Sequence, residues 1–242
     1  MALFPKTPGV YIEEIPRFPS SVAAVPTSVP VFIGYTAKAE KNGDLDALLN
    51  TPVRIESLLE FETIFGGAFQ ESFIATLAGP SIDIAVAKIE LGVEKFRLYY
   101  HMLMYFGNGG GPCYIISVGD YGDLIADGPI IDGINKAEQV DEITMVVVPE
   151  SIALSQSDRR DVYNAMLAHS AKMQDRFAIM DVEVITTGVN TIQNDADEFR
   201  DDTIGANNLS YGAAYYPSFK PSFPFSYLDT AVTITAIAPN LP

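Results

Sequence analysis

Short, dense runs of apolar residues recur along the chain, separated by longer stretches with a helical period. The runs are rich in β-branched residues and bounded by Gly, Pro or Asp, which is typical of buried strands. They cover Val29–Tyr35, Cys113–Val118, Ile143–Val148 and Phe177–Met180. Since strands and helices alternate from Cys113 to Asp181, we expect an α/β fold with a mixed, largely parallel sheet and flanking helices.

The clearest helix signal follows Ser57. Ser57 and Glu60 have the spacing of a capping box, in which each side chain accepts a hydrogen bond from a free backbone N–H of the first turn. Three- and four-residue steps then place one set of apolar side chains on a common face, namely Leu58, Phe61, Ile64 and Phe65. The pair Gly66-Gly67 is expected to end this helix.

Three further helices are expected. One starts near Val93 and ends at Gly107–Gly111, with inward positions Phe96, Tyr100, Leu103, Met104 and Phe106. The next begins at Asp158 with Ser157 as its cap, and faces the core with Val162, Met166, Leu167 and Met173. The last carries the apolar positions Ile192, Ala196, Phe199 and Ile204.

Other stretches have a weaker pattern. Asp120–Gly133 is rich in Gly and Asp and predicts a loop, followed by a short helix over Ile134–Val140. Residues 68–92 are apolar without a clean period, which indicates a small insertion or a β-rich excursion. Tyr211–Tyr216 and Ala231–Ala236 predict strands near the end of the chain.

Residues 1–28 predict an extended N-terminal arm ahead of an α/β domain at 29–242. Recurring prolines exclude a helix there, because each removes a backbone donor and restricts the residue before it. Between two of them lies a possible strand, formed by Val10, Tyr11, Ile12, Glu13, Glu14 and Ile15. A lone strand must pair with a sheet. The pairing sheet either belongs to a neighbouring molecule, reached through the Pro-rich spacer, or is an edge of the same domain.

Composition narrows the class of protein. Of the 242 residues, 48% are hydrophobic and 11% aromatic, which suits a folded chain with a sizeable core. The formal net charge is −16, with an isoelectric point near 4.3, and this argues against binding to nucleic acid or to an anionic membrane surface. The mean hydropathy of +0.16 fits a subunit that buries surface against other copies of itself.

The sequence also bears on the cellular compartment. Its beginning, MALFPKTPG, lacks the features of a signal peptide, and no apolar run approaches the ~20 residues of a membrane span. The single cysteine, Cys113, excludes an intrachain disulfide and a thiolate metal cluster. We therefore expect synthesis in a reducing cytoplasm, no direct membrane insertion and no cofactor.

Several residues are candidates for chemistry, and each has a structural explanation. The segment FGNGGGPC lacks the Lys of a phosphate-binding loop and follows a helix instead of preceding one. The acidic residues of 195–202 do not have calcium-loop spacing and predict a solvated helix face. His101 and His169 have no second metal ligand nearby in the sequence. Asp181, at the end of a predicted strand, would be catalytic only with a partner that the motifs do not supply.

Five blocks of the sequence resemble contractile phage tail sheath proteins, the family that also covers pyocin, type VI secretion and extracellular injection-system sheaths. They are TPGVYIEEI with VPVFIGYT, then PVRIESLLEFETIFGG, FGNGGGPCYIISVG, DRFAIMDVE and FRDDTIGANNLSYGAAYYPSF. The blocks occur in the family's order over nearly the whole chain. The chain departs from the family pattern at Tyr215-Tyr216-Pro217-Ser218-Phe219, where the family usually has YYPWL.

The resemblance implies a structural sheath subunit of a contractile injection machine, not an enzyme. Such subunits form stacked six-fold rings around an inner tube, and contraction drives the tube through a target envelope. The implied partners are other copies or paralogous sheath subunits, the inner tube protein, and baseplate and cap proteins. The expected location is the bacterial cytoplasm on synthesis, and then an assembled phage-tail-like particle, which in some systems is released from the cell.

Other interpretations stay open at this stage. Members of the family continue past a point like Pro242 with a further domain and a C-terminal arm, which are expected to be absent from this chain, either because it is truncated or because this copy is shortened. A cap, terminator or baseplate-proximal protein with the sheath fold is the nearest alternative. An α/β enzyme with a site at Asp181 is the more distant one.

Overall fold

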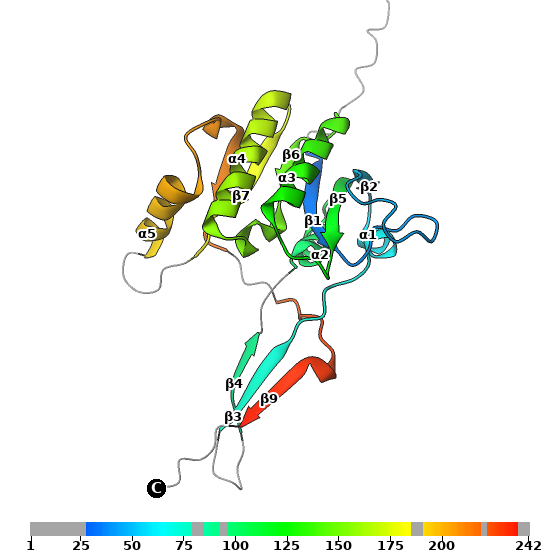
Figure 1. Cartoon of the computed structure of the whole chain (residues 1–242), viewed down its shortest axis with the longest axis vertical. Coiled ribbons are helices and arrows are strands. Elements are labelled where there is room, and N and C mark those ends of the chain that lie inside the picture. The colour runs from blue at the N-terminus through cyan, green and yellow to red at the C-terminus, as the bar shows by residue number, and fades with distance from the viewer. Residues whose placement is uncertain (1–27, 79–84, 92–95, 185–190, 219–221, 237–242) are drawn as a thin grey trace, which may run out of the picture.

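The computed structural model describes residues 28–78, 85–91, 96–184, 191–218 and 222–236. Two sheets organise these residues: a six-stranded sheet flanked by helices, and a three-stranded sheet that projects from one end of it (Figure 1). The predicted strand Val10–Ile15 lies outside the described residues.

The centre of the six-stranded sheet is β1 (Pro30–Thr36), in which every residue is buried. It pairs in parallel with β5 (Cys113–Asp120) on one side and with β6 (Met145–Val147) on the other. Beyond β6 follow β7 (Phe177–Asp181) and β8 (Gly212–Tyr215), both parallel. Only β2 (Val53–Ile55), at the edge beside β5, runs antiparallel. The prediction of a mixed, largely parallel sheet is confirmed.

Side chains of β1 alternate between two apolar clusters, as a strand covered on both faces requires. Val31, Ile33 and Tyr35 pack in one cluster with residues of α3 (Asp127–Lys136) and α4 (Gln156–Met173). Phe32 packs in the other cluster with residues of α1 (Leu58–Phe65) and α2 (Leu98–Gly107). The helices α3 and α4 lie side by side over one face (Figure 1).

The second sheet contains the strands formed within residues 68–92, the stretch without a clean period. The strand β3 (Phe73–Ala78) pairs antiparallel with β4 (Ala85–Leu91) and parallel with β9 (Val232–Ala236). Of the two interpretations of residues 68–92, the β-rich one is therefore confirmed. The partner β9 comes from a point more than 140 residues later in the chain, which no local pattern could indicate.

Shorter elements complete the chain. The helix α5 (Thr191–Glu198) continues into a π-helical turn at Phe199–Thr203. Short 3-10 turns occupy Ala137–Gln139, Pro149–Ala153, Leu209–Tyr211 and Asp229–Ala231. The strand predictions for Tyr211–Tyr216 and Ala231–Ala236 are confirmed with slightly shorter bounds.

Two helix predictions were wrong in their limits. The expected loop at Asp120–Gly133 is helical from Asp127 onward, and the short helix of Ile134–Val140 is its last turns followed by a 3-10 turn. Position 133 in α3 requires Gly, because any larger side chain would collide with Val118 and Ile33 of the sheet below. The cap of α4 is Ser155, whose hydroxyl accepts a hydrogen bond from the Asp158 N–H at 3.3 Å, and not Ser157.

Two predicted faces also differ. In α2 the fully buried side chains are Leu98 and Met102, whereas Tyr100, Leu103 and Met104 are only half-buried. Near α5, the acidic residues are not all solvated: Asp195 is buried and accepts a hydrogen bond from the Tyr216 hydroxyl at 3.1 Å. Both differences place polar or aromatic side chains at surfaces shared with later segments.

Candidate functional site: open strand edges and an aromatic groove

The predicted inter-subunit strand, Val10–Ile15, lies outside the described residues, so the structure bears on the edges that could accept such a strand. Among the described strands, β4 and β9 are the outer strands of the second sheet and β2 and β8 those of the main sheet. An outer strand presents a row of backbone N–H and C=O groups to any chain that can pair with it. The edges β4 and β9 have seven and five residues, whereas β2 and β8 have three and four.

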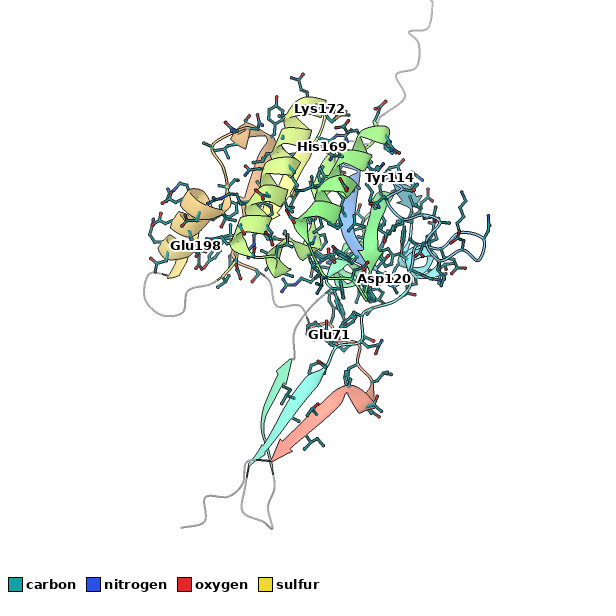
Figure 2. The ribbon with its side chains drawn as sticks, in the orientation of Figure 1. Glu71, Tyr114, Asp120, His169, Lys172 and Glu198 are labelled. Atoms are coloured by element: carbon teal, nitrogen blue, oxygen red, sulfur yellow. The ribbon has the colours of Figure 1, made fainter. Side chains whose placement is uncertain are left out.

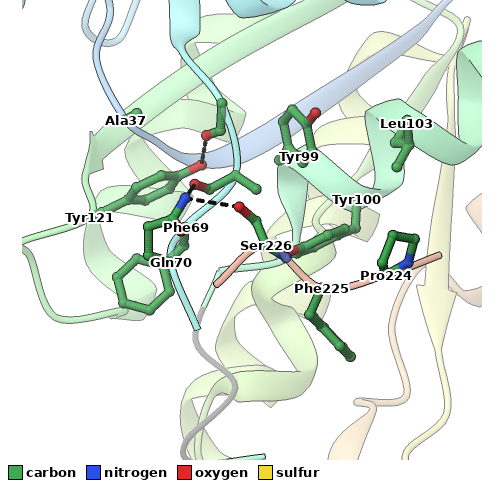
Figure 3. Close-up of a pocket in the computed structure, with 12 residues that line it drawn as sticks. Ala37, Phe69, Gln70, Tyr99, Tyr100, Leu103, Tyr121, Pro224, Phe225 and Ser226 are labelled. Carbon is green, nitrogen blue, oxygen red and sulfur yellow. Dashed lines mark hydrogen bonds between the residues drawn. The ribbon is translucent and has the colours of Figure 1, made fainter. Parts of the chain in front are cut away.

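A groove of about 830 Å³ lies where the second sheet joins the α/β body. Aromatic side chains from distant segments line it, with Tyr99 and Tyr100 from α2 and Tyr121 from the loop after β5 (Figure 3). The remaining lining residues are Ala37, Gly67, Ala68, Phe69, Gln70, Leu103, Pro224, Phe225 and Ser226. The groove is thus built by five parts of the sequence, and its surface is mainly apolar.

The three tyrosine hydroxyls of the groove are all engaged. Tyr99 donates to the Glu62 carboxylate at 2.8 Å, and Tyr121 donates to the Gly67 carbonyl at 3.0 Å. The Tyr100 hydroxyl accepts a hydrogen bond from the Ser226 N–H at 2.9 Å. Because the polar ends of the rings are already bonded, the surfaces they offer to the groove are chiefly ring faces and edges.

Aromatic stacking fixes the wall of the groove. Phe69 lies edge-on to both Tyr121 and Phe96, with ring centroids 5.5 and 5.2 Å away, and Phe96 lies 4.8 Å from Tyr121. Burial is the main cause that raises the pKa of the Tyr121 hydroxyl, and the Glu150 carboxylate adds to it. Burial, followed by the bond to Glu62, raises the pKa of Tyr99 to about 12. Both phenols therefore stay neutral in the physiological range.

Behind this wall, a fully buried carboxylate joins three elements. Glu150 follows β6, and its Oε1 accepts hydrogen bonds from the Arg97 and Leu98 N–H groups at the start of α2, at 3.2 and 3.0 Å. Its other oxygen, Oε2, has no hydrogen-bond partner within the described part of the chain and lies against Gly34 of β1, where any Cβ would collide with it. Burial raises the pKa of Glu150 to about 7, although its hydrogen bonds to backbone N–H groups oppose the shift.

Sequence reasoning missed Glu150 and the groove. One signal was present for Glu150, since Pro149-Glu150 directly follows the apolar run Ile143–Val148, and such positions lie at the carboxyl edge of a parallel sheet. The groove had no comparable signal, because its residues are spread from Ala37 to Ser226.

The structure places the candidate residues for chemistry in separate surroundings. Cys113 is buried in β5, and burial raises the pKa of its thiol to about 12. His169 lies on α4 (Figure 2). Its ring is buried, and its Nε2 lies 3.1 Å from the guanidinium of Arg176, which is a donor, so Nε2 is the accepting nitrogen. His101 Nδ1 lies 3.1 Å from the Arg97 carbonyl. Within the described ranges, no group of three His, Cys, Asp or Glu side chains could hold a metal ion.

Asp181 ends β7, and its backbone carbonyl accepts a hydrogen bond from the Tyr163 hydroxyl at 2.8 Å. His169 instead contacts Arg176, which precedes β7. Five residues of extended strand span about 16 Å, so Asp181 and His169 are not brought together.

No helix in the described segments combines the length and the apolar character needed to cross a bilayer.

Comparisons with known proteins find likenesses among solved structures. No protein-family model matches the chain, and no curated protein matches it. Among solved structures, it is similar to a chain in the cryo-EM structure of the anti-feeding prophage (AFP) baseplate, 6-fold symmetrised, with 24% sequence identity and a TM-score of 0.47. The match covers 88% of this chain and 47% of that one, so the present chain spans about half the length of its structural neighbour.

Proposed function

We propose that this protein is a structural component of a contractile, phage-tail-like injection machine, and that within the machine it is a sheath subunit. The observation that carries the proposal is the order of the five sequence blocks that resemble sheath proteins. The blocks fall on the elements that build the α/β body, including β1, α1, β5, β7 and β8. The proposal assigns the protein no catalytic step.

Subunits of such a machine must stay joined while they move, and we propose that Val10–Ile15 join them by adding a strand to a neighbour. The arm strand has six residues, so the edges that match it in length are β4 and β9, not β2 or β8. An added strand satisfies its own backbone groups and those of the edge at the same time.

The energy of one such contact is small. About five backbone hydrogen bonds contribute roughly 0.5–1.5 kcal/mol each, while ordering six residues costs roughly 1–2 kcal/mol each. One arm alone is therefore near balance or unfavourable, and the side chains of Tyr11, Ile12 and Ile15 must be buried for it to hold. In an assembly the arms act together, because each contact keeps the next one at a high effective concentration. The Pro-rich spacer then serves as the tether while the bodies shift.

The test compares polymerisation of variants by negative-stain microscopy and sedimentation. The wild-type protein is expected to form stacked rings or tubes. Deletion of Met1–Ile15, and the substitution Ile12→Pro in the full-length chain, are expected to give a folded protein that does not polymerise, because Pro removes a ladder donor. The matched control Ile12→Val keeps the strand and should polymerise.

Each outcome separates the alternatives. Normal tubes from the deletion variant would refute strand addition by the arm. Single rings that never extend, from the wild-type protein, would favour the cap, terminator or baseplate-proximal role over the sheath. A wild-type protein that stays monomeric at all concentrations would count against every assembly role, and a catalytic function at Asp181 would then need to be considered.

A further inference from the structure

A six-residue pattern occurs twice in the chain, once in the N-terminal arm and once beside the groove. Residues 16–21 read PRFPSS and residues 221–226 read PSFPFS, so both follow the pattern Pro-x-Phe-Pro-x-Ser. The second occurrence ends in Pro224, Phe225 and Ser226, which line the groove. The structure therefore shows how this surface holds the last part of the pattern.

Three contacts seat that segment. The Phe225 ring lies edge-on to Tyr100 with centroids 5.3 Å apart, and the Ser226 N–H donates to the Tyr100 hydroxyl at 2.9 Å. The Ser226 hydroxyl accepts a hydrogen bond from the Gln70 side chain at 2.9 Å (Figure 3). The surface thus binds an aromatic ring, a backbone N–H and a serine hydroxyl from an extended chain.

This segment does not fill the groove. About 830 Å³ remains beside it, bounded by Tyr99, Leu103, Tyr121 and Phe69, which are all half-buried. A volume of this size is within the range of pockets that hold compact ligands. Grooves lined by aromatic rings are surfaces on which extended, proline-rich segments dock.

We propose that the groove binds the segment Pro16–Ser21 of a second copy of this chain. The occupant has the same pattern as the segment already seated there, and its prolines would lie against the ring faces of Tyr99 and Tyr121. Its Arg17 would lie near Glu62, the carboxylate that accepts the Tyr99 hydroxyl at the rim of the groove. In a chain with a net charge of −16, a cation in the arm complements this surface.

Chain length favours a second copy over the same molecule. The groove lies at the carboxyl end of β1, since Ala37, the residue directly after β1, lines it, whereas the arm joins at the amino end of β1. Seven residues of extended strand span about 23 Å. The seven steps from Ser21 to Ser28 reach at most about 25 Å when fully extended. No length remains for the arm to pass around the helices that cover the sheet.

This inference rests on the proposed function only in that both join copies of the chain through the arm. The strand Val10–Ile15 and the segment Pro16–Ser21 are adjacent but separate contacts. Together they would fix one copy's arm at two points, at a strand edge of the second sheet and at the groove where that sheet joins the body.

Disulfide trapping in the full-length protein tests the proposal. One preparation carries Ser20→Cys, at a variable position of the pattern, and a second, with a longer tag, carries Leu103→Cys in the groove. The native Cys113 is fully buried and contributes little background. The control partner carries Ile192→Cys on α5, where Ile192 is 66% exposed and does not line the groove. The readout is the heterodimer on a non-reducing gel.

We expect the heterodimer with Leu103→Cys to form at least about tenfold faster than the one with Ile192→Cys, because docking raises the effective thiol concentration. A peptide of residues 15–22 should suppress the fast reaction, and the same peptide with Phe18→Ala and Pro19→Ala should not. Equal rates for the two partners, or no heterodimer at all, would overturn the proposal. So would rapid intramolecular closure in a diluted chain carrying both Ser20→Cys and Leu103→Cys.

The same variants separate this inference from the proposed function. Adding Ile12→Pro should abolish polymers and leave the cross-link with Leu103→Cys in place. Polymers that form without any specific cross-link would leave the sheath role standing and refute the occupant of the groove. A specific cross-link in a protein that never polymerises even with its native Ile12 would support the groove contact and count against the sheath role.

Discussion

Replacing Glu150 with Gln tests whether the buried carboxylate makes folding depend on pH. Gln has nearly the same shape, and its carbonyl oxygen can keep accepting the N–H groups of Arg97 and Leu98. The new amide replaces Oε2, which has no hydrogen-bond partner in the described part of the chain, so no such bond is lost. A buried amide N–H without an acceptor adds a penalty that is constant with pH. The titration of Glu150 is therefore seen in how the difference in the free energy of unfolding between the two proteins changes with pH.

The expected magnitude follows from the pKa in the two states. In the folded protein burial raises the pKa of Glu150 from 4.5 to about 7, so the folded state binds a proton more tightly than the unfolded state does. This stabilisation is fully present below the unfolded pKa and is lost as pH rises through the folded pKa. The total loss is about 3 kcal/mol, of which about 2 kcal/mol falls between pH 5.5 and 8.

The assay is urea unfolding of the wild-type protein and Glu150→Gln at several pH values from 5.5 to 8, above the isoelectric point of about 4.3. The difference in the free energy of unfolding between the two proteins cancels the other titrating groups. It should change by about 2 kcal/mol in favour of the variant as pH rises. The control Asp141→Asn removes one negative charge at an exposed position, and it measures how much the loss of a surface charge alone contributes to the difference. A flat difference for Glu150→Gln would refute the reasoning.

Three further predictions concern local contacts. Gly66→Ala should destabilise the protein by about 1–3 kcal/mol in urea unfolding, because Gly66 has φ +84° and ψ −174° and a Cβ there would lie 2.6 Å from the Cβ of Ala37. The control Gly67→Ala places its Cβ in open space and should be nearly neutral. Ser57→Ala should cost about 1 kcal/mol through loss of the cap of α1, and Ser57→Thr should restore most of it. His169 should stay neutral down to acid pH in an NMR titration, since burial and then the neighbouring guanidinium lower its pKa to about 4. The stability linked to this lowered pKa is fully present above pH 6.5 and is lost as pH falls through 4. A titration of His169 near pH 6.5 would contradict the prediction.

The capping box shows how far local sequence reasoning reaches. Ser57 Oγ accepts from the Glu60 N–H at 3.2 Å as expected, and α1 has the predicted limits. The Glu60 carboxylate, however, accepts from the Glu56 N–H at 2.8 Å, one residue earlier than in the standard box. Cap geometry depends on a few adjacent residues, so the sequence comes close to fixing it.

The helix α3 shows where that reasoning fails. Its Gly128, Pro129 and Gly133 predict a loop, because Gly and Pro are poor residues for a helix interior. The buried side chains Ile130 and Ile134 pack on the sheet, and Pro129 falls in the first turn, where its missing N–H costs nothing. Packing against the tertiary core outweighed the local propensities.

The sequence alone determined the α/β class, the central strand Pro30–Thr36 and most of the strands around it, because buried parallel strands are recorded directly in dense apolar runs. Only the tertiary structure decided that β9 would pair with β3, that Glu150 would lie against Gly34, and that a groove would form between segments far apart in the chain. Those features depend on contacts between residues separated by about a hundred positions or more. Such contacts leave no period in the sequence, since they are set by how finished elements pack together.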